Sequence, residues 1–179
     1  TMEDLLQVTD EMMAYLRGNR EDLHVMTVIG GEPREFFNER EIAHMEDVRA
    51  LFLEGLLMRR IMAVLAVTLI LFIALRRKKD TVYILARSFQ AGSAVIAALV
   101  LVLGLVISTD FTKYFTIFHQ IFFDNDLWIL DPSTDLLINI VPEPFFVDTA
   151  LSIGLMFAVP LAAVLAVSTV YCRRIKVSR

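Results

Sequence analysis

Residues 61–75 read I-M-A-V-L-A-V-T-L-I-L-F-I-A-L, and this uncharged, apolar stretch decides the fold of the chain. A helix needs about 20 residues to cross the hydrocarbon core of a bilayer. We therefore expect the helix to begin earlier, near Leu53, with Arg59 and Arg60 extending their charged ends toward the interface. The predicted element is a transmembrane helix over residues 53–76.

Two further stretches, residues 88–107 and 149–172, are also long and apolar enough to span a bilayer. Hydrophobic residues make up 56% of the chain, which exceeds the share in an ordinary soluble domain. Each stretch is predicted to be a helix, because hydrocarbon satisfies no backbone hydrogen bonds. The expected fold is an all-α membrane protein, a transmembrane helix bundle with three spans and an extracellular cap.

Charge orients this bundle. R-R-K-K at residues 76–79 and R-R-I-K-V-S-R at residues 173–179 share one side if three spans alternate, and positive charge marks that side as cytoplasmic. Residues 1–60 hold 13 acids against 7 arginines, and residues 108–148 hold 7 acids against one lysine, so both are placed outside. The predicted order is cap 1–52, span 53–76, cytoplasmic loop 77–87, span 88–107, cap 108–148, span 149–172 and cytoplasmic tail 173–179.

The chain starts with Thr1, and no export signal precedes its outside segment. We expect a preceding transmembrane helix, which gives four spans in the parent protein. The single cysteine, Cys172, falls on the reducing side, so no disulfide framework is expected and an unmodified thiol is favoured over an acylated one.

The first part of the cap is predicted to hold two helices. Residues 18–36 contain Gly30, Gly31 and Pro33 and indicate a turn-rich or short β connection. The second helix is expected to begin near Asn38 or Glu39 and to continue into the first span. The first helix, residues 2–16, ends before Gly18 as a plausible C-cap, and its apolar side comprises Leu5, Leu6, Val8, Met12, Met13, Tyr15 and Leu16.

The second part of the cap contains His119 in an aromatic-rich block, residues 113–132. Histidine can take and return a proton near neutral pH, and large aromatic rings suit the boundary between water and lipid. The combination indicates proton transfer on a lipidic substrate. An interfacial helix that packs its aromatic side on the bilayer explains the rings but not the histidine. The block supplies candidate substrate-binding rings (Phe115, Phe118, Phe122, Phe123 and Trp128) and candidate supporting groups (Tyr114, Asp124, Asn125 and Asp126).

His44 is the second candidate. Asp47 lies one helical turn after it and is expected to orient its imidazole and stabilise the protonated form. A surface histidine beside a solvated acid is the plainer interpretation of the same pattern. Phe115 and Phe122 are expected to flank His119, and its direction of pKa shift stays open, since burial and the nearby acids act oppositely. Replacing His24 is expected to have almost no effect on activity.

Other chemistries are less well supported. His44, His119, Asp124 and Asp126 could supply metal ligands, yet H-E-x-x-H and paired-cysteine motifs are absent from the sequence, so no metal or other cofactor is predicted. The serines lack the context of a nucleophile elbow. Asn125, Tyr114, Trp128 and backbone amides are open candidates for an oxyanion donor.

Four segments in order carry a family resemblance: E-M-M-A-Y-L-R (11–17), H-M-E-D-V-R-A-L-F (44–52), F-H-Q-I-F-F-D-N-D-L-W-I-L-D-P (118–132) and V-P-E-P-F-F (141–146). The chain resembles the bacterial lipoprotein intramolecular transacylases of Gram-positive membranes. The resemblance implies catalytic roles for His44 and His119 at the outer face of a multi-pass cell-membrane protein.

The resemblance also implies the reaction. The sn-2 acyl chain of a diacylglyceryl-modified N-terminal cysteine moves to the α-amino group of the same cysteine, which gives a lyso-form lipoprotein. The expected partners are such lipoproteins and membrane lipid, with no nucleic acid, and a monomer is expected. Another lipid-active acyltransferase or deacylase and a non-catalytic membrane assembly factor stay open as alternatives.

Overall fold

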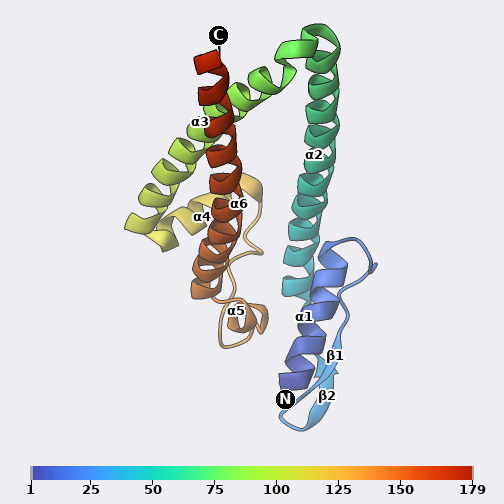
Figure 1. Ribbon diagram of the computed structural model, residues 1–179. Coiled ribbons are helices and arrows are strands. Elements are labelled where there is room, and N and C mark those ends of the chain that lie inside the picture. The colour runs from blue at the N-terminus through green and yellow to red at the C-terminus, as the bar shows by residue number, and fades with distance from the viewer. Residues whose placement is uncertain (1, 179) are drawn as a thin grey trace. The chain divides into compact units, whose positions relative to one another are not determined.

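The computed structural model describes residues 2–178, with side chains described through residue 175. Residues 1 and 179, the latter in the predicted tail, lie outside the described part. The chain is mostly helical (Figure 1), with elements in the order α1 (Met2–Leu16), β1 (Met26–Ile29), β2 (Glu32–Glu35), α2 (Glu39–Arg77), η1 (Lys78–Asp80), α3 (Thr81–Thr109), α4 (Phe111–Phe122), α5 (Leu137–Ile140) and α6 (Glu143–Ser178).

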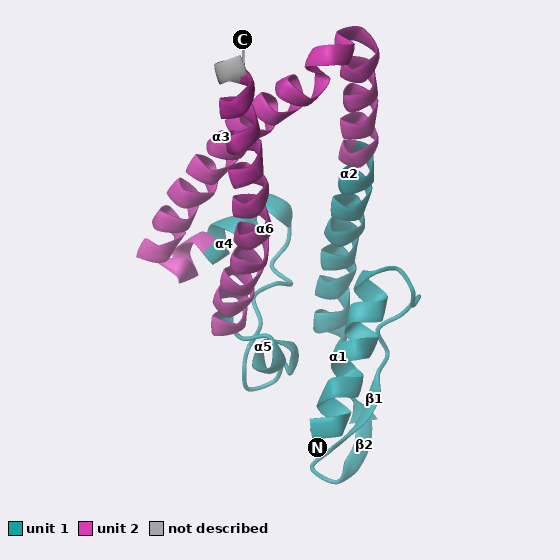
Figure 2. Ribbon diagram, viewed as in Figure 1, with its two compact units in different colours: residues 1–61, 115–143 teal, residues 62–114, 144–179 magenta. Residues whose placement is uncertain are grey.

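The chain divides into two compact units, coloured separately in Figure 2. The first unit comprises residues 1–61 and 115–143, and the second comprises residues 62–114 and 144–179. The predicted site residues lie in the first unit, with the exception of Tyr114, which belongs to the second.

Helix α1 forms over the residues that the apolar spacing predicts. Gly18 ends it in the left-handed region, at φ +77°, where glycine is favoured over other residues. The N–H of Gly18 donates to the Tyr15 carbonyl and that of Asn19 donates to the Ala14 carbonyl, which is the Schellman pattern of a helix C-terminus. Leu5 and Leu6 are exposed, unlike the rest of the predicted apolar side, because the core contacts α1 only from Val8 onward.

Strands β1 and β2 form an antiparallel hairpin in which Ile29 pairs with Glu32. Gly30 and Gly31 form its two-residue turn at φ +66° and +92°. Two consecutive positive φ angles define the turn that matches strand twist best, and glycine adopts them without strain. The short β connection predicted between the two cap helices is therefore present, and the all-α description needs this one addition.

Among its described residues, the first unit has one buried apolar core. It joins α1 to the residues that flank the hairpin, to the start of α2 and to α5, and so fixes the helix turn next to His44. Its fully buried members are Val8, Met12, Tyr15, Leu16, Leu23, Val25, Phe37, Met45 and Leu137.

Helix α2 begins at a reciprocal cap. The side chain of Asn38 accepts the N–H of Glu41 at 3.0 Å, while Glu41 Oε2 accepts the N–H of Asn38 at 2.7 Å. This capping box satisfies two N–H groups that a helix start otherwise leaves free. The predicted start at Asn38 or Glu39 is correct, and α2 continues without a break to Arg77.

Two helical stretches within the described residues are long and apolar enough to cross a membrane. They are Glu39–Thr109, in which η1 separates α2 from α3, and Glu143–Ile175 in α6. Only 6% and 0% of their most apolar windows are buried in protein, so they do not resemble core helices of a soluble domain. The count of three spans stays a prediction.

The helices of the second unit extend beyond the predicted spans. Helix α3 starts at Thr81 rather than near residue 88, and α6 starts at Glu143 rather than 149. Pro144 is compatible with this early start, because the first turn of a helix does not need its N–H. Within this unit, Gln90 Nε2 donates to Ser168 Oγ at 3.2 Å and joins α3 to α6.

Candidate active site

His119 lies on α4 with 8% of its surface exposed. Its Nδ1 atom is 2.7 Å from the carbonyl oxygen of Phe115, one turn earlier on the helix. A carbonyl only accepts hydrogen bonds, so Nδ1 must carry the hydrogen. In the neutral ring, Nε2 then has a free lone pair and can act as a base.

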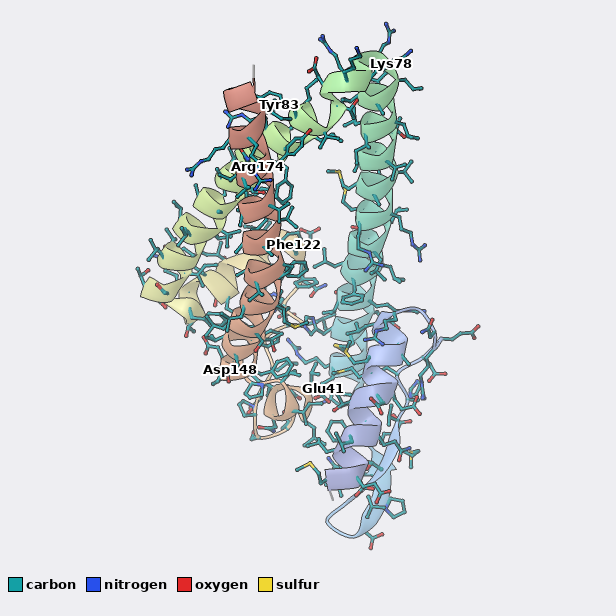
Figure 3. All side chains as sticks on the ribbon, in the orientation of Figure 1. Glu41, Lys78, Tyr83, Phe122, Asp148 and Arg174 are labelled. Carbon is teal, nitrogen blue, oxygen red and sulfur yellow. The ribbon has the colours of Figure 1, made fainter. Side chains whose placement is uncertain are left out.

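Aromatic rings surround this imidazole. Trp128 stacks on it with ring centroids 4.9 Å apart and planes at 29°. Phe115, Phe118 and Phe123 pack on His119 at centroid distances of 4.3, 5.4 and 5.6 Å. Phe122, predicted to flank His119, is instead half exposed (Figure 3) and packs on Phe118 at 4.7 Å. The difference arises because the chain leaves the helix after Phe122, so Phe123 turns inward.

His44 lies on α2, and its ring centroid is 6.1 Å from that of His119. Phe123 contacts His44 edge to face at 5.3 Å and His119 at 5.6 Å, and so fills the space beside both. The fold thus brings together two imidazoles that are 75 positions apart in the sequence.

The environment of His44 disfavours its charged form. Burial lowers the pKa of His44 from 6.5 to about 4, and the charge of His119 acts in the same direction, while Asp47 opposes both. His44 precedes residue 53, where the predicted membrane span begins. Its buried Nδ1 has no hydrogen-bond partner among the described residues. An unpartnered buried polar atom is costly, and such atoms occur where a ligand or a reacting group supplies the partner.

Asp47 does not hold the Nδ1 atom of His44, contrary to the sequence-based expectation. Its carboxylate accepts a hydrogen bond from Asn125 Nδ2 at 2.8 Å. The side-chain oxygen of Asn125 accepts the N–H of Leu127 at 3.0 Å, and its backbone oxygen accepts the indole N–H of Trp128 at 2.8 Å. Asn125 therefore fixes the loop that carries Trp128, and its bond to Asp47 uses one of the two hydrogens of the amide that is a candidate oxyanion donor.

Asp124 and Asp126, the two aspartates predicted as supporting groups, are exposed. Asp126 is held from its backbone, because the guanidinium of Arg40 donates to its carbonyl oxygen, and Arg40 Nη2 also lies 3.6 Å from Asp126 Oδ1. Arg59 and Arg60 are exposed on α2. No group of three or more histidine, cysteine, aspartate or glutamate side chains that could hold a metal ion occurs within the described residues.

Residues 1–146 match the protein family described as lipoprotein intramolecular transacylase Lit. The chain belongs to this family. The resemblance inferred from the four sequence segments is thereby confirmed, and so is the expectation that the protein is an acyltransferase.

A solved structure, that of the membrane-integral Lit transacylase from Bacillus cereus, has the same fold. The two are 22% identical with a TM-score of 0.60, and the match covers 98% of this chain and 72% of that chain. No curated protein matches the chain.

No role was predicted from the sequence for Glu41, Arg40 or Asp135 of this Lit family member. Glu41 had one available signal, since it lies three residues before His44 and six before Asp47 on one side of a helix. Arg40 and Asp135 had none, because their partners lie 86 and 97 residues away in the chain. Tyr114 belongs to the second unit, so its predicted supporting role stays a prediction.

Proposed function

We propose that this protein moves the sn-2 acyl chain of a diacylglyceryl-modified cysteine onto the α-amino group of that same cysteine. The observation that supports this is the pair of buried imidazoles, 6.1 Å apart and packed among aromatic rings. One of them has a free Nε2 lone pair, as the reaction requires. The family supplies the substrate class, lipoproteins.

In the proposed reaction, the amine nitrogen attacks the ester carbonyl carbon and the bond from that carbon to the glycerol oxygen breaks. The transition state closes an eight-membered ring through nitrogen, Cα, Cβ, sulfur, two glycerol carbons, the ester oxygen and the carbonyl carbon. Medium rings close poorly in solution, so holding the two ends together supplies much of the rate. The product is an N-acyl, lyso-form lipoprotein, and no co-reactant is consumed.

The proton transfers are assigned to the two histidines. The amine, with a pKa near 8, loses its proton to Nε2 of His119, and the departing glycerol oxygen gains one proton. His44 is the acid partner. Because burial lowers the pKa of His44 to about 4, it enters the reaction as a neutral ring. As its N–H proton passes to the glycerol oxygen, its other nitrogen takes up the proton that His119 removed from the amine, so both rings end neutral. If His44 is instead the base and His119 the acid, His44 must have the free Nε2 lone pair.

The acyl chains are assigned to the exposed aromatic rings. Phe118 and Phe122 are 43% and 51% exposed, whereas Phe123 is buried against both histidines. Exposed phenylalanine rings beside a buried base suit an acyl chain whose ester end must reach that base. The proposed site faces the outside of the cell membrane of a Gram-positive bacterium, with three spans in the described chain, and one chain carries both histidines.

The direct test is mass spectrometry of a lipoprotein N-terminus from cells with and without this protein. The proposal expects conversion of the diacylglyceryl form into an N-acyl lyso-form of equal mass, which fragmentation distinguishes. Release of free fatty acid would identify a deacylase instead. An intact diacylglyceryl N-terminus in both cells would leave the assembly factor as the better explanation.

A further inference from the structure

Glu41 is a buried carboxylate that the proposed chemistry does not use. It lies in the first turn of α2 (Figure 3), is 1% exposed, and precedes His44 by one helical turn. Its two oxygens accept different backbone N–H groups. Oε2 accepts that of Asn38 at 2.7 Å, and Oε1 accepts that of Leu137 at 2.6 Å. Removing a carboxylate from water is costly, and short hydrogen bonds to the ionised group offset that cost.

The two bonds serve different purposes. The bond to Asn38 closes the capping box and is local to α2. The bond to Leu137 joins residues 96 positions apart and attaches the start of α5 to α2. A capping box alone needs neither complete burial nor the second oxygen.

A second, part-buried contact runs beside the first. Asn38 Nδ2 donates to Asp135 Oδ1 at 2.8 Å, and Asp135 Oδ2 accepts the N–H of Asp131 at 2.7 Å. Asp135 is only 4% exposed. The segment that follows the His119 loop is therefore fastened to the start of α2 at two points, one buried and one part-buried.

We propose that Glu41 is a positioning residue that sets the separation of the two histidines. His44 lies on α2 between two fastening points, the Glu41–Leu137 bond and the Asp47–Asn125 bond. His119 precedes the segment that both points hold. The histidine rings share only packing contacts, so these bonds, with Phe123 packed against both rings, fix their geometry. The inference rests on the proposed function, because it assigns an effect on that reaction.

The test compares Glu41→Gln with Glu39→Gln in the full-length protein. Glu39 is exposed and lies in the same helix turn, so its substitution removes the same charge without touching the fastening. Glutamine at 41 keeps one acceptor but points an NH₂ group at one of the two N–H donors, so it cannot satisfy both. A shift of about 1 Å in a reacting group costs up to roughly 100-fold in rate.

With a synthetic diacylglyceryl lipopeptide, Glu41→Gln should lower kcat roughly 10- to 100-fold and leave KM within about twofold, because it moves the histidines and not the acyl contacts. Glu39→Gln should match the wild type. In a His44→Gln background, Glu41→Gln should cause little further loss, since the partner that it positions is gone. A general structural defect would lower the residual rate in that background as well.

A kcat for Glu41→Gln within about twofold of wild type would overturn the positioning role, and so would full multiplication of the two losses in the double variant. If Glu41→Gln does not assemble, Glu41→Asp replaces it, because the shorter side chain keeps the charge but cannot reach both donors. If the wild-type protein itself does not convert the lipopeptide, the proposed reaction is contradicted. Wild-type activity with an unaffected Glu41→Gln variant contradicts only the positioning role.

Discussion

Trp128 lies stacked on the imidazole of His119, and its indole N–H is bonded to the backbone oxygen of Asn125. The indole is thus fixed at its edge while its face covers the histidine ring. On the same histidine, Nδ1 is tied to the Phe115 carbonyl. Ring plane and tautomer are both set before any substrate binds, which is the preorganisation that proton transfer to a defined atom requires.

The tautomer of His119 is directly measurable. Because Nδ1 donates to a carbonyl, the neutral ring should carry its hydrogen on Nδ1 and leave Nε2 bare. In ¹⁵N spectra of histidine-labelled protein near neutral pH, the signals lost in His119→Gln should show this pattern. A hydrogen on Nε2 would contradict the assignment of His119 as the base.

Replacing either of the two histidines proposed as catalytic should remove most of the activity. General acid–base groups contribute about 100- to 10,000-fold, so His44→Gln and His119→Gln should each lose at least ~100-fold in lyso-form production. Glutamine keeps hydrogen-bonding capacity but cannot carry a proton at neutral pH. His24→Gln is the matched control, because His24 is exposed on the cap and pairs with Glu35. Full turnover by either catalytic variant, with normal membrane insertion, would exclude its proposed role.

Stability should fall on mild acidification because of His44. Its pKa is lowered to about 4 in the folded protein, chiefly by burial, whereas an unfolded imidazole titrates near 6.5. The unfolded state binds more protons between these values, so the contribution is complete above pH 6.5 and is lost as the pH falls toward 4. The full loss is on the order of 3 kcal/mol.

Apparent melting temperatures in detergent, measured from pH 7.5 to 4.5, should therefore decline more steeply for wild type than for His44→Gln. Asp135 does not interfere in this window. Burial would raise the pKa of its carboxyl, but hydrogen bonds from Asp131, Asn38 and Thr134 together hold it below the usual value. Parallel curves for wild type and His44→Gln would show that His44 is not buried as a neutral ring.

Local elements of the cap could be predicted because their causes are local. The apolar spacing of residues 2–16, the positive φ at Gly18 and the Gly30-Gly31 turn each depend on neighbours within a few residues. The exposure of Leu5 and Leu6 could not be predicted, because periodicity shows which residues share a side of a helix but not how far the surface that packs against it extends.

The residue types that meet at the candidate site could be predicted from the sequence, but their connections could not. His44 and His119 were identified from their surroundings in sequence, and the fold does bring them together. The Asp47–Asn125 bond spans 78 residues, and the Glu41–Leu137 bond spans 96. Helical spacing predicts that Asp47 contacts His44. Its carboxylate instead accepts a hydrogen bond from the side-chain amide of Asn125, in a loop far away in the sequence.

The orientation in the membrane is tested by cysteine labelling after replacement of the native, buried Cys172 by serine. Arg and Lys clustered at residues 76–79 predict a cytoplasmic turn there. A cysteine at Glu32 or Ser133, both exposed, should react with an impermeant reagent from outside, and one at Lys79 should not. Reversed labelling would place the histidines on the cytoplasmic side and end the proposed assignment to the outer face.

The acyl chain should be transferred within a single substrate molecule. The pair of imidazoles found among the described residues suits one diacylglyceryl cysteine, whose own amine and sn-2 ester reach a high effective concentration when held together. A transfer between molecules would need a donor lipid bound beside the acceptor, or an acyl group held covalently between two binding events.

The experiment mixes two lipopeptides of different peptide mass, of which one carries heavy-labelled acyl chains. After conversion by the full-length protein, the label should remain on the peptide that carried it, because the amine attacks an ester of its own molecule. The His119→Gln variant controls for uncatalysed migration, which must be subtracted. Extensive exchange of label between the two peptides would rule out the intramolecular route, even with both histidines essential.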